Sequence, residues 1–348
     1  LSKNLVGMIY ATETLKKRSI LMSNNVALIT GGLGFIGSTL ANTLIKRKIV
    51  TKCILLDNFG SFINPLKSSY NDYRPKRVIS SKKFIIERGD ASNTQITLKL
   101  IQKYKPTLIY HTAALPLAKI ENLNATEASI GSVDATKNLI ENLNFVRSTS
   151  NNYIIKRFVY FSSSMIYGDF KSDVVSENTK ANPKEIYGTM KLAGEVITEG
   201  LCGYYNIDYT SIRPSAVYGP TDMNQRVSQI FIEKAIKGEK IFIQGKDEKL
   251  DFTYVGDLVE GVILASIKKN GANNTFNITN GKGRSLLEFV KILKKYFPKI
   301  KYEISGRDNF RPKRGTLSIN KAKKLLGYKP KYSIEKGIKE YLKYLKKI

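Results

Sequence analysis

The chain is poor in the residues that carry most metal and nucleophile chemistry. Among 348 residues there are one histidine, His111, two cysteines, Cys53 and Cys202, and no tryptophan. We therefore expect no metal site, and a Ser–His–Asp triad would depend on His111 alone. Two cysteines without a disulfide or metal spacing favour a reduced, cytoplasmic protein.

Long hydrophobic runs are missing as well. No stretch of about 18 apolar residues occurs, so we expect no membrane span and no membrane partner. The apolar fraction of 42% is ordinary for a globular protein. A chain of this length can bury one large core or two modest ones.

Acidic residues are scarce: 29 Asp and Glu face 57 Lys and Arg, which gives a net charge of +28. Such charge is compatible with nucleic-acid binding. It is also compatible with lysine-rich, solvated helix faces, as in residues 291–295, and a basic surface attracts small anionic substrates. We favour solvated faces and expect no nucleic-acid partner.

The first residues differ from the rest. Residues 1–21 are mildly basic and lack an apolar pattern, and Met22 precedes the first apolar strand. We interpret 1–21 as an extension, possibly disordered, with Met22 as a candidate natural start. A transit peptide is less favoured because the segment is short and contains Glu13.

A glycine-rich loop follows the first expected strand, residues 26–30, and precedes a helix expected to end near Lys46. Gly31, Gly34 and Gly37 give a G-x-x-G-x-x-G variant of the dinucleotide fingerprint. A tight turn, close approach to a pyrophosphate and close helix packing each require glycine. The helix start, with Phe35 and Ile36, would face the phosphates.

The second expected strand, residues 53–56, ends at Asp57. A carboxylate about 20 to 25 residues after the loop accepts hydrogen bonds from the adenosine ribose and repels a 2′-phosphate. Asp57, followed by Asn58, therefore favours NAD over NADP. An aspartate that merely begins a surface turn is the alternative.

Strands and helices then alternate. Expected strands cover 84–86, 107–110 and 156–161, and expected helices cover 96–104 and 125–144. This alternation predicts an α/β fold, a Rossmann-type doubly wound parallel sheet. Residues 148–152 are expected to form a loop tip, and 61–81 a longer irregular excursion.

Tyr187 and Lys191 stand four residues apart, which places them on one face of a helix. A nearby ammonium favours the phenolate of a tyrosine, and a phenolate near neutral pH is a general base. Taken alone, the pair is also compatible with an exposed tyrosine beside a solvated lysine.

Eight ordered motifs resemble the extended short-chain dehydrogenase/reductases, specifically the NAD-dependent nucleotide-sugar epimerase/dehydratase family. The resemblance spans about residues 25–330. The motifs lie at 30–37, Asp57, 89–90, 111–114, 162–168, Tyr187 with Lys191, 213–220 and 251–258.

The resemblance implies roles for individual residues. Tyr187 would be the base, Lys191 would lower its pKa and hold the nicotinamide ribose, and Ser163 would bind the sugar 4-oxygen. Further cofactor contacts would come from residues that follow strand ends; these are Asp90, Ala91, Ala113, Ala114 and Pro214. His111 is assigned no chemical role.

The resemblance also bears on the reaction. Family 4,6-dehydratases carry Asp-Glu where this chain has Ser164 and Met165, and decarboxylases carry a Glu at the second position. Neither Ser164 nor Met165 exchanges a proton near neutral pH. We therefore favour a 4-epimerase of UDP-hexose or UDP-hexuronate, similar to UDP-glucose and UDP-glucuronate 4-epimerases. Dehydratase, decarboxylase, reductase and a non-catalytic NAD-binding regulator are the alternatives.

The second half is expected to bind the nucleotide sugar. The resemblance implies a Rossmann domain over 22–213 with a return segment near 251–280, and a smaller α/β substrate domain over 214–250 and 281–348. Ser163, Ser164, Arg226 and Arg314 are its candidate substrate ligands. Two positions depart from the family: Leu250 replaces an arginine, and Ala216 an asparagine. A homodimer through helices near 92–104, 125–144 and 186–201 is also implied.

Overall fold

The computed structural model describes residues 25–60, 77–114, 124–222 and 224–346. Its centre is a seven-stranded sheet in which every pairing is parallel. In spatial order the strands are β12 (Asn274–Asn277), β7 (Tyr209–Arg213), β5 (Arg157–Phe161), β4 (Leu108–His111), β1 (Val26–Thr30), β2 (Lys52–Asp57) and β3 (Phe84–Arg88). The predicted α/β Rossmann-type fold is confirmed. The expectations for residues 1–21 and for most of 61–81 lie outside the described residues.

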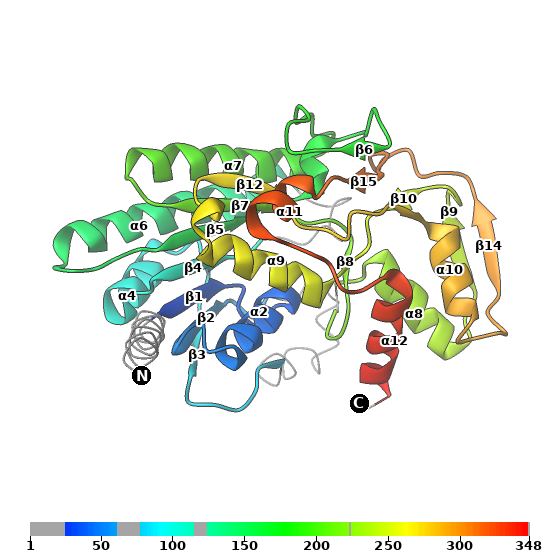
Figure 1. Ribbon diagram of the computed structural model, residues 1–348, viewed down its shortest axis with the longest axis horizontal. Helices are drawn as coiled ribbons and strands as arrows, with labels where there is room; N and C mark the ends of the chain where they lie inside the picture. Colours follow the sequence, from blue (N-terminus) through cyan, green and yellow to red (C-terminus); the bar gives the residue numbers. More distant parts are fainter. Residues whose placement is uncertain (1–24, 61–76, 115–123, 223, 347–348) are drawn as a thin grey trace, which may run out of the picture.

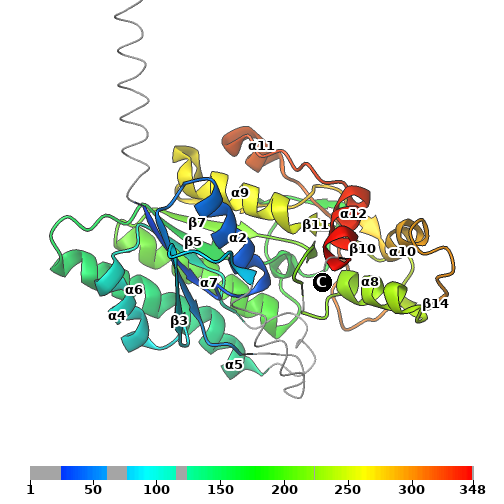
Figure 2. The same ribbon diagram turned by 90° about the horizontal axis from the view of Figure 1, so that it is seen from below.

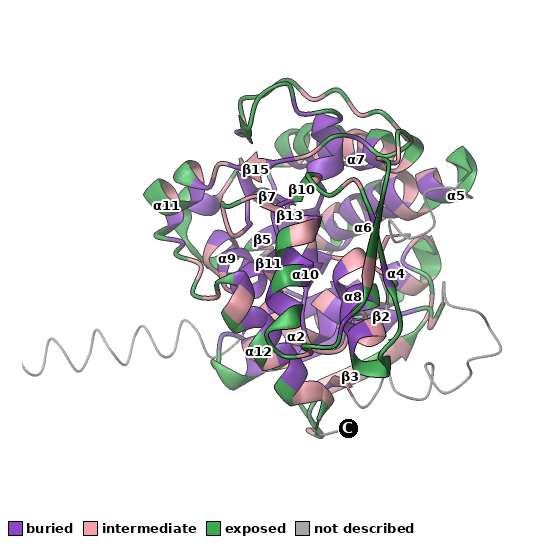
Figure 3. Ribbon diagram, turned by 90° about the vertical axis from the view of Figure 1, so that its right-hand side faces the viewer, coloured by how far each residue is buried: buried purple, intermediate pink, exposed green. Residues whose placement is uncertain are grey.

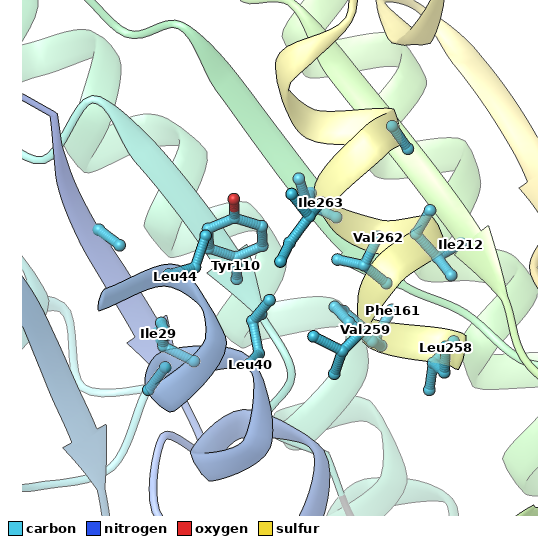
Figure 4. Close-up of a cluster of buried hydrophobic side chains, with 14 of the residues drawn as sticks. Ile29, Leu40, Leu44, Tyr110, Phe161, Ile212, Leu258, Val259, Val262 and Ile263 are labelled. Carbon is cyan, nitrogen blue, oxygen red and sulfur yellow. The ribbon is translucent and has the colours of Figure 1, made fainter. Parts of the chain in front are cut away.

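Helices cover both faces of the sheet (Figures 1 and 2). One face is covered by α2 (Phe35–Lys46) and α9 (Val255–Ile267), the other by α4 (Thr94–Tyr104), α6 (Ala135–Thr149) and α7 (Ile186–Tyr204). Because both faces are buried, the strands read as continuous apolar runs. In Figure 4, Leu40 and Leu44 of α2 meet Val259, Val262 and Ile263 of α9 above the sheet.

The helix expected over 125–144 is interrupted. The chain forms α5 (Ala125–Ser129), one π-helical turn η3 (Ile130–Asp134) and then α6. This turn is packed tightly against α7, since a Cβ on Gly194 would lie 2.8 Å from the Ser132 carbonyl oxygen. A π turn inserts an extra residue, and such turns are frequent at functional sites.

A smaller C-terminal α/β region packs beside the sheet. Its main elements are α8 (Val227–Lys237), β9 (Ile241–Gln244), α10 (Leu286–Lys294), β14 (Tyr302–Ser305) and α12 (Ile334–Leu345). They share a separate apolar core that includes Phe231, Phe289 and Ile338. Figure 3 faces this region and shows the exposed residues of α10 and α12 turned toward solvent.

The remaining elements are short. They are η4 (Ser164–Tyr167), β6 (Val174–Val175), β8 (Val217–Tyr218), β10 (Lys249–Leu250), β11 (Thr253–Tyr254), η5 (Lys269–Gly271), β13 (Arg284–Ser285), β15 (Thr316–Leu317) and α11 (Asn320–Leu326). Asp251 anchors them: fully buried, it accepts hydrogen bonds from Thr279 Oγ1 at 3.0 Å and from the amides of Gly281 and Leu317, each at 3.1 Å. In the part of the chain that the structure describes, every helix is too short or too polar to cross a membrane.

Candidate functional site

A cavity of about 560 Å³ opens at the carboxyl ends of the strands, where parallel α/β sheets bind ligands. All residues that the sequence assigned to cofactor or substrate line this cavity: Gly31, Gly34, Phe35, Ile36, Gly37, Asp57, Asn58, Asp90, Ala91, Ala113, Ala114, Ser163, Ser164, Tyr187, Lys191, Pro214, Arg226 and Arg314. The sheet therefore brings together residues that lie almost 300 positions apart in the chain.

The glycine-rich loop is shaped for a phosphate group. Gly31 has φ +65° and lies so near the end of β4 that a Cβ would be 3.0 Å from the Ala113 nitrogen. A Cβ on Gly37 would collide with the Gly31 carbonyl oxygen. Helix α2 begins at Gly34 without a side-chain cap or an acidic residue in its first turn. Its free N–H groups and positive end therefore fit the pyrophosphate of NAD.

Asp57 is held in one orientation at the end of β2. Its Oδ2 accepts from the Leu33 amide at 3.0 Å, and its Oδ1 accepts from the Phe59 amide at 2.9 Å. The side chain of Asn58 donates to Asp90 at 2.9 Å. Although burial favours the protonated form of Asp90, hydrogen bonds from Ser92 and Asn58 hold its pKa below the ordinary value. These carboxylates suit the hydroxyl groups of an adenosine ribose.

Ser163 and Tyr187 meet in the cavity. Ser163 follows β5 and caps η4, where its Oγ accepts from the Met165 amide at 3.2 Å. Tyr187 lies in the first turn of α7 and forms a hydrogen bond with Ser163. The two hydroxyl groups therefore lie close together, and both can reach a single sugar oxygen.

Burial is the main influence on the pKa of Tyr187 in this structure. Burial raises the pKa of Tyr187, opposed by the charge of Arg226 and the bond to Ser163. Lys191 directs its Nζ to the Phe161 carbonyl oxygen at 2.6 Å, and this nitrogen lies 5.9 Å from the centre of the Tyr187 ring. Burial also lowers the pKa of Lys191 to about 7, opposed by Glu195. Burial therefore outweighs the nearby charges on Tyr187, and the role of Lys191 in lowering its pKa stays a prediction.

His111 has the structural place that was expected. Its Nδ1 is 2.7 Å from Thr30 Oγ1, and the ring is buried beneath the cavity without lining it. Burial, and then the charge of Lys191, lowers the pKa of His111 to about 3. The buried, neutral ring therefore has a structural role at the carboxyl end of β4.

Arg314 enters the cavity from the small region. Burial lowers its pKa to about 10, and the charge of Arg311 acts in the same direction. It forms no ion pair with a carboxylate of the described residues. A desolvated guanidinium without such a partner suits a phosphate ligand.

Arg311 is a cavity residue that sequence reasoning missed. Its signal was the Arg-Pro pair that opens the segment in which Arg314 lies. Leu250, where the family resemblance leads us to expect an arginine, is 7% exposed and lines the same cavity, whereas Lys249 turns to Asp173 at 4.0 Å. Arg311, rather than Lys249, therefore adds a second cation beside Arg314.

Arg226 lines the same cavity as this pair. The charges that act on Arg314 are Arg311, Glu248 and Glu185, whereas Arg226 acts on Tyr187 and Asp222. The placement of Arg226 with the diphosphate ligands stays a prediction.

Glu185 is a second residue that sequence reasoning missed. It caps α7, with Oε1 accepting from the Gly188 amide at 2.9 Å, while Oε2 is buried without a hydrogen-bond partner among the described residues. Burial raises its pKa, and its charge disfavours the phenolate of Tyr187. Its signal was a polar residue immediately before the helix that carries Tyr187.

Comparisons with known proteins agree with this geometry. The "Putative UDP-glucose 4-epimerase" of Methanocaldococcus jannaschii is 30% identical over 332 residues, covering 92% of this chain and 98% of its own. The UDP-glucuronic acid 4-epimerase of Bacillus cereus, solved with UDP-glucuronic acid and NAD, superimposes with a TM-score of 0.82 at 26% identity. The UDP-glucose 4-epimerase of Thermotoga maritima, solved with UDP-glucose, gives 0.79 at 26%. Each structure covers 92% of this chain and 99% of its own.

The sequence profile of one family, described as "NAD dependent epimerase/dehydratase family", matches residues 27–279. This range contains the glycine-rich loop, Asp57, Ser163, Tyr187 and Lys191. The cavity, the likeness to solved epimerases and the profile agree, and the chain belongs to the NAD-dependent epimerase/dehydratase family.

Proposed function

We propose that the protein is a nucleotide-sugar 4-epimerase that acts on a UDP-hexose or UDP-hexuronate through a transient 4-keto sugar. The observation that carries the proposal is the meeting of Ser163 and Tyr187 beside Lys191 in a cavity that also holds the glycine-rich loop. Similarity to UDP-glucose and UDP-glucuronate 4-epimerases supports it.

The protein residues have separate tasks in this scheme. Tyr187, as phenolate, accepts the proton of the sugar 4-hydroxyl, and Ser163 holds the same oxygen. Bound NAD supplies the acceptor, and later the donor, of the C4 hydride. Arg314 and Arg311 bind the diphosphate, while Lys191 holds the nicotinamide ribose. Return of the hydride to the opposite face of the ketone inverts C4.

The positions of the carboxylates around the cavity favour epimerisation over dehydration and decarboxylation. Among the described residues, those that line it are Asp57, Asp90 and Glu127. Asp57 ends β2 and Asp90 follows β3, both on the adenosine side, and Glu127 is an exposed residue in the first turn of α5. Ser164 and Met165 offer no carboxyl for eliminating water or releasing carbon dioxide.

One observation favours a second candidate, a dehydratase or decarboxylase. Glu185 carries a carboxyl close enough to Tyr187 to influence its charge. We rank this candidate below epimerisation because Glu185 does not line the cavity and its Oε2 is buried.

The test is incubation with UDP-glucose, UDP-glucuronate and other UDP-sugars in the presence of catalytic NAD+. The proposal predicts the C4 epimer, seen by NMR and mass spectrometry, with no net NADH. A 4-keto-6-deoxy sugar or a pentose product would establish the second candidate. Cofactor binding without turnover across the panel would indicate a non-catalytic regulator.

We further propose a cytoplasmic homodimer with the domain division given above, 22–213 with 251–280 and 214–250 with 281–348. Exposed apolar side chains on the expected dimer helices support the assembly: Ile130 is 43% and Val196 is 64% exposed. Light scattering should give twice the chain mass of 39.1 kDa, and Val196→Glu should halve the observed value. A monomeric wild-type protein would contradict the proposed homodimer.

A further inference from the structure

A buried hydrogen-bond network lies behind the wall of the cavity. Arg213, the last residue of β7, donates from Nε and Nη2 to the two carboxylate oxygens of Glu195, at 2.9 and 2.7 Å. Its Nη1 donates to the Tyr167 hydroxyl at 2.8 Å, and this hydroxyl donates to Asn277 Oδ1 at 2.9 Å. Each of these four residues is at most 8% exposed, and none of them lines the cavity. The network is therefore shielded from solvent.

Two members of the network belong to elements that also carry residues of the site. Tyr167 ends η4, the short turn that Ser163 caps. Glu195 lies on α7, one turn after Lys191 and about two turns after Tyr187, so the three side chains follow one side of the helix. The network therefore connects the element that holds Ser163 with the helix that holds Tyr187.

Helix α7 also touches η4 at a second point. Gly188, in the first turn of α7, lies so close that a Cβ there would be 2.7 Å from the Met165 carbonyl oxygen. At a rise of 1.5 Å per residue, this contact and Glu195 are about 10 Å apart along the helix. One contact would allow α7 to turn against η4, whereas two separated contacts fix the angle between them.

The network keeps the same hydrogen bonds across neutral pH. Burial disfavours the charge of Arg213, but its bonds to Glu195 hold its pKa above the ordinary value. Burial raises the pKa of Tyr167 to about 12, opposed by the charge of Arg213. The hydroxyl therefore stays protonated and donates to Asn277 while it accepts from Arg213. Removing this hydroxyl would remove two hydrogen bonds without removing a charge.

We propose that this network is a positioning device, which holds the hydroxyl groups of Ser163 and Tyr187 at the separation from which both reach one sugar oxygen. Tyr167 and Arg213 do not line the cavity and act only through η4 and α7. The inference rests on the proposed function, because the shared sugar oxygen belongs to the 4-epimerase scheme. A displacement of about 1 Å between reacting groups can cost about 100-fold in rate, so the network contributes to kcat.

A network that only stabilised the protein would behave differently, and kinetics separate the two roles. Loss of positioning lowers kcat by the same factor at every pH and leaves the affinity for NAD unchanged. Loss of stability alone lowers the urea midpoint, while the folded enzyme keeps its kcat.

The experiment compares the wild type with Tyr167→Phe, with Tyr153→Phe as the matched control. Phenylalanine removes only the hydroxyl of Tyr167 and keeps the ring, which stands edge-on to Phe170 with 6.0 Å between ring centres. Tyr153 is 6% exposed, and its hydroxyl donates to the Pro106 carbonyl oxygen at 2.8 Å. Both residues of that bond precede strands, β5 and β4, so it lies at the edge of the sheet opposite to the cavity.

Four quantities are measured for each protein: kcat and KM from acidic to alkaline pH, the Kd for NAD, the urea midpoint, and the crystal structure with NAD bound. For Tyr167→Phe we expect kcat to fall about tenfold at every pH, with KM and the Kd for NAD changed less than about twofold. Ser163 Oγ and Tyr187 Oη should lie more than about 3.5 Å apart, beyond hydrogen-bond distance. Tyr153→Phe should lower the urea midpoint and keep both kcat and the wild-type separation.

If Tyr167→Phe fails to fold, Arg213→Lys decides. Lysine keeps the positive charge but lacks the planar fork that reaches Glu195 and Tyr167 together. We expect the same fall in kcat and the same separation of the two hydroxyl groups in this variant.

Either an unchanged separation of the Ser163 and Tyr187 hydroxyl groups or a wild-type kcat in the folded variant overturns the proposal. An equal fall in Tyr153→Phe, or a fall confined to one end of the pH range, overturns it as well. The crystal structures need no turnover. A wild type that forms no epimer therefore contradicts the proposed function, whereas the measured separation still decides the role of the network.

Discussion

Replacing Gly37 by alanine tests the glycine-rich loop most directly. The added Cβ would collide with the Gly31 carbonyl oxygen and lie 3.0 Å from Gly32 Cα, whereas ordinary contact begins at 3.4 Å. Both neighbours are backbone atoms between β1 and α2, so the loop and helix must separate by roughly 1 Å. Forced overpacking of this kind costs about 1–3 kcal/mol.

The same displacement moves the α2 N–H groups away from the pyrophosphate. Each charge-assisted hydrogen bond lost is worth about 1.5–3 kcal/mol, and 1.4 kcal/mol is tenfold in Kd. We therefore expect Gly37→Ala to weaken NAD binding at least about tenfold by calorimetry and to lower the urea midpoint.

Gly203→Ala is the matched control. Gly203 also lies in a helix, α7, but a Cβ there would meet nothing within 4 Å. Alanine should stabilise this helix by up to about 1 kcal/mol without changing the affinity for NAD. Unchanged NAD affinity and stability in Gly37→Ala would refute the account of the loop.

Further substitutions test other parts of the site. Asp57→Asn should weaken the binding of NAD about tenfold and reduce the preference for NAD over NADP, measured as the ratio of the two Kd values. An unchanged ratio would contradict the role of Asp57 in cofactor selection. Glu195→Gln breaks the buried pair in which Arg213 donates at 2.9 and 2.7 Å, so urea unfolding should show a loss of about 3–5 kcal/mol; a loss below about 1 kcal/mol would contradict that estimate. Glu185→Gln keeps an acceptor for the Gly188 amide and should retain epimerisation within about threefold; a folded variant without turnover would make Glu185 an acid–base group.

The sheet and the cofactor loop could be predicted because their signals are local. Residues 26–30 form the expected strand with the expected bounds. The strands β1 and β2 are largely apolar runs, and the residues after parallel strands must lie at one edge of the sheet. The cavity therefore gathers every candidate that the motifs supplied.

The small region could not be predicted in the same detail. Its pairings join segments of two to four residues far apart in sequence, such as β8 with β11 and β9 with β14. Such short strands leave no period to detect. The π turn at Ile130–Asp134 has the composition of an ordinary helix, and close packing against α7 at Gly194 distinguishes it.

The electrostatics of the site also lie beyond sequence. Spacing places Tyr187 and Lys191 on one helix face, but burial of both decides their pKa values. Arg226, at the beginning of another helix, lines the same cavity as Tyr187, and only the fold shows that they share it.

The fate of a deuterium label at C4 of a UDP-sugar substrate tests the central claim most directly. Epimerisation removes the C4 hydride and returns it to the opposite face, so the product should be the C4 epimer with deuterium still at C4 and no net NADH. Deuterium found at C6 of a dehydrated sugar, or lost to free NADH, would contradict the account.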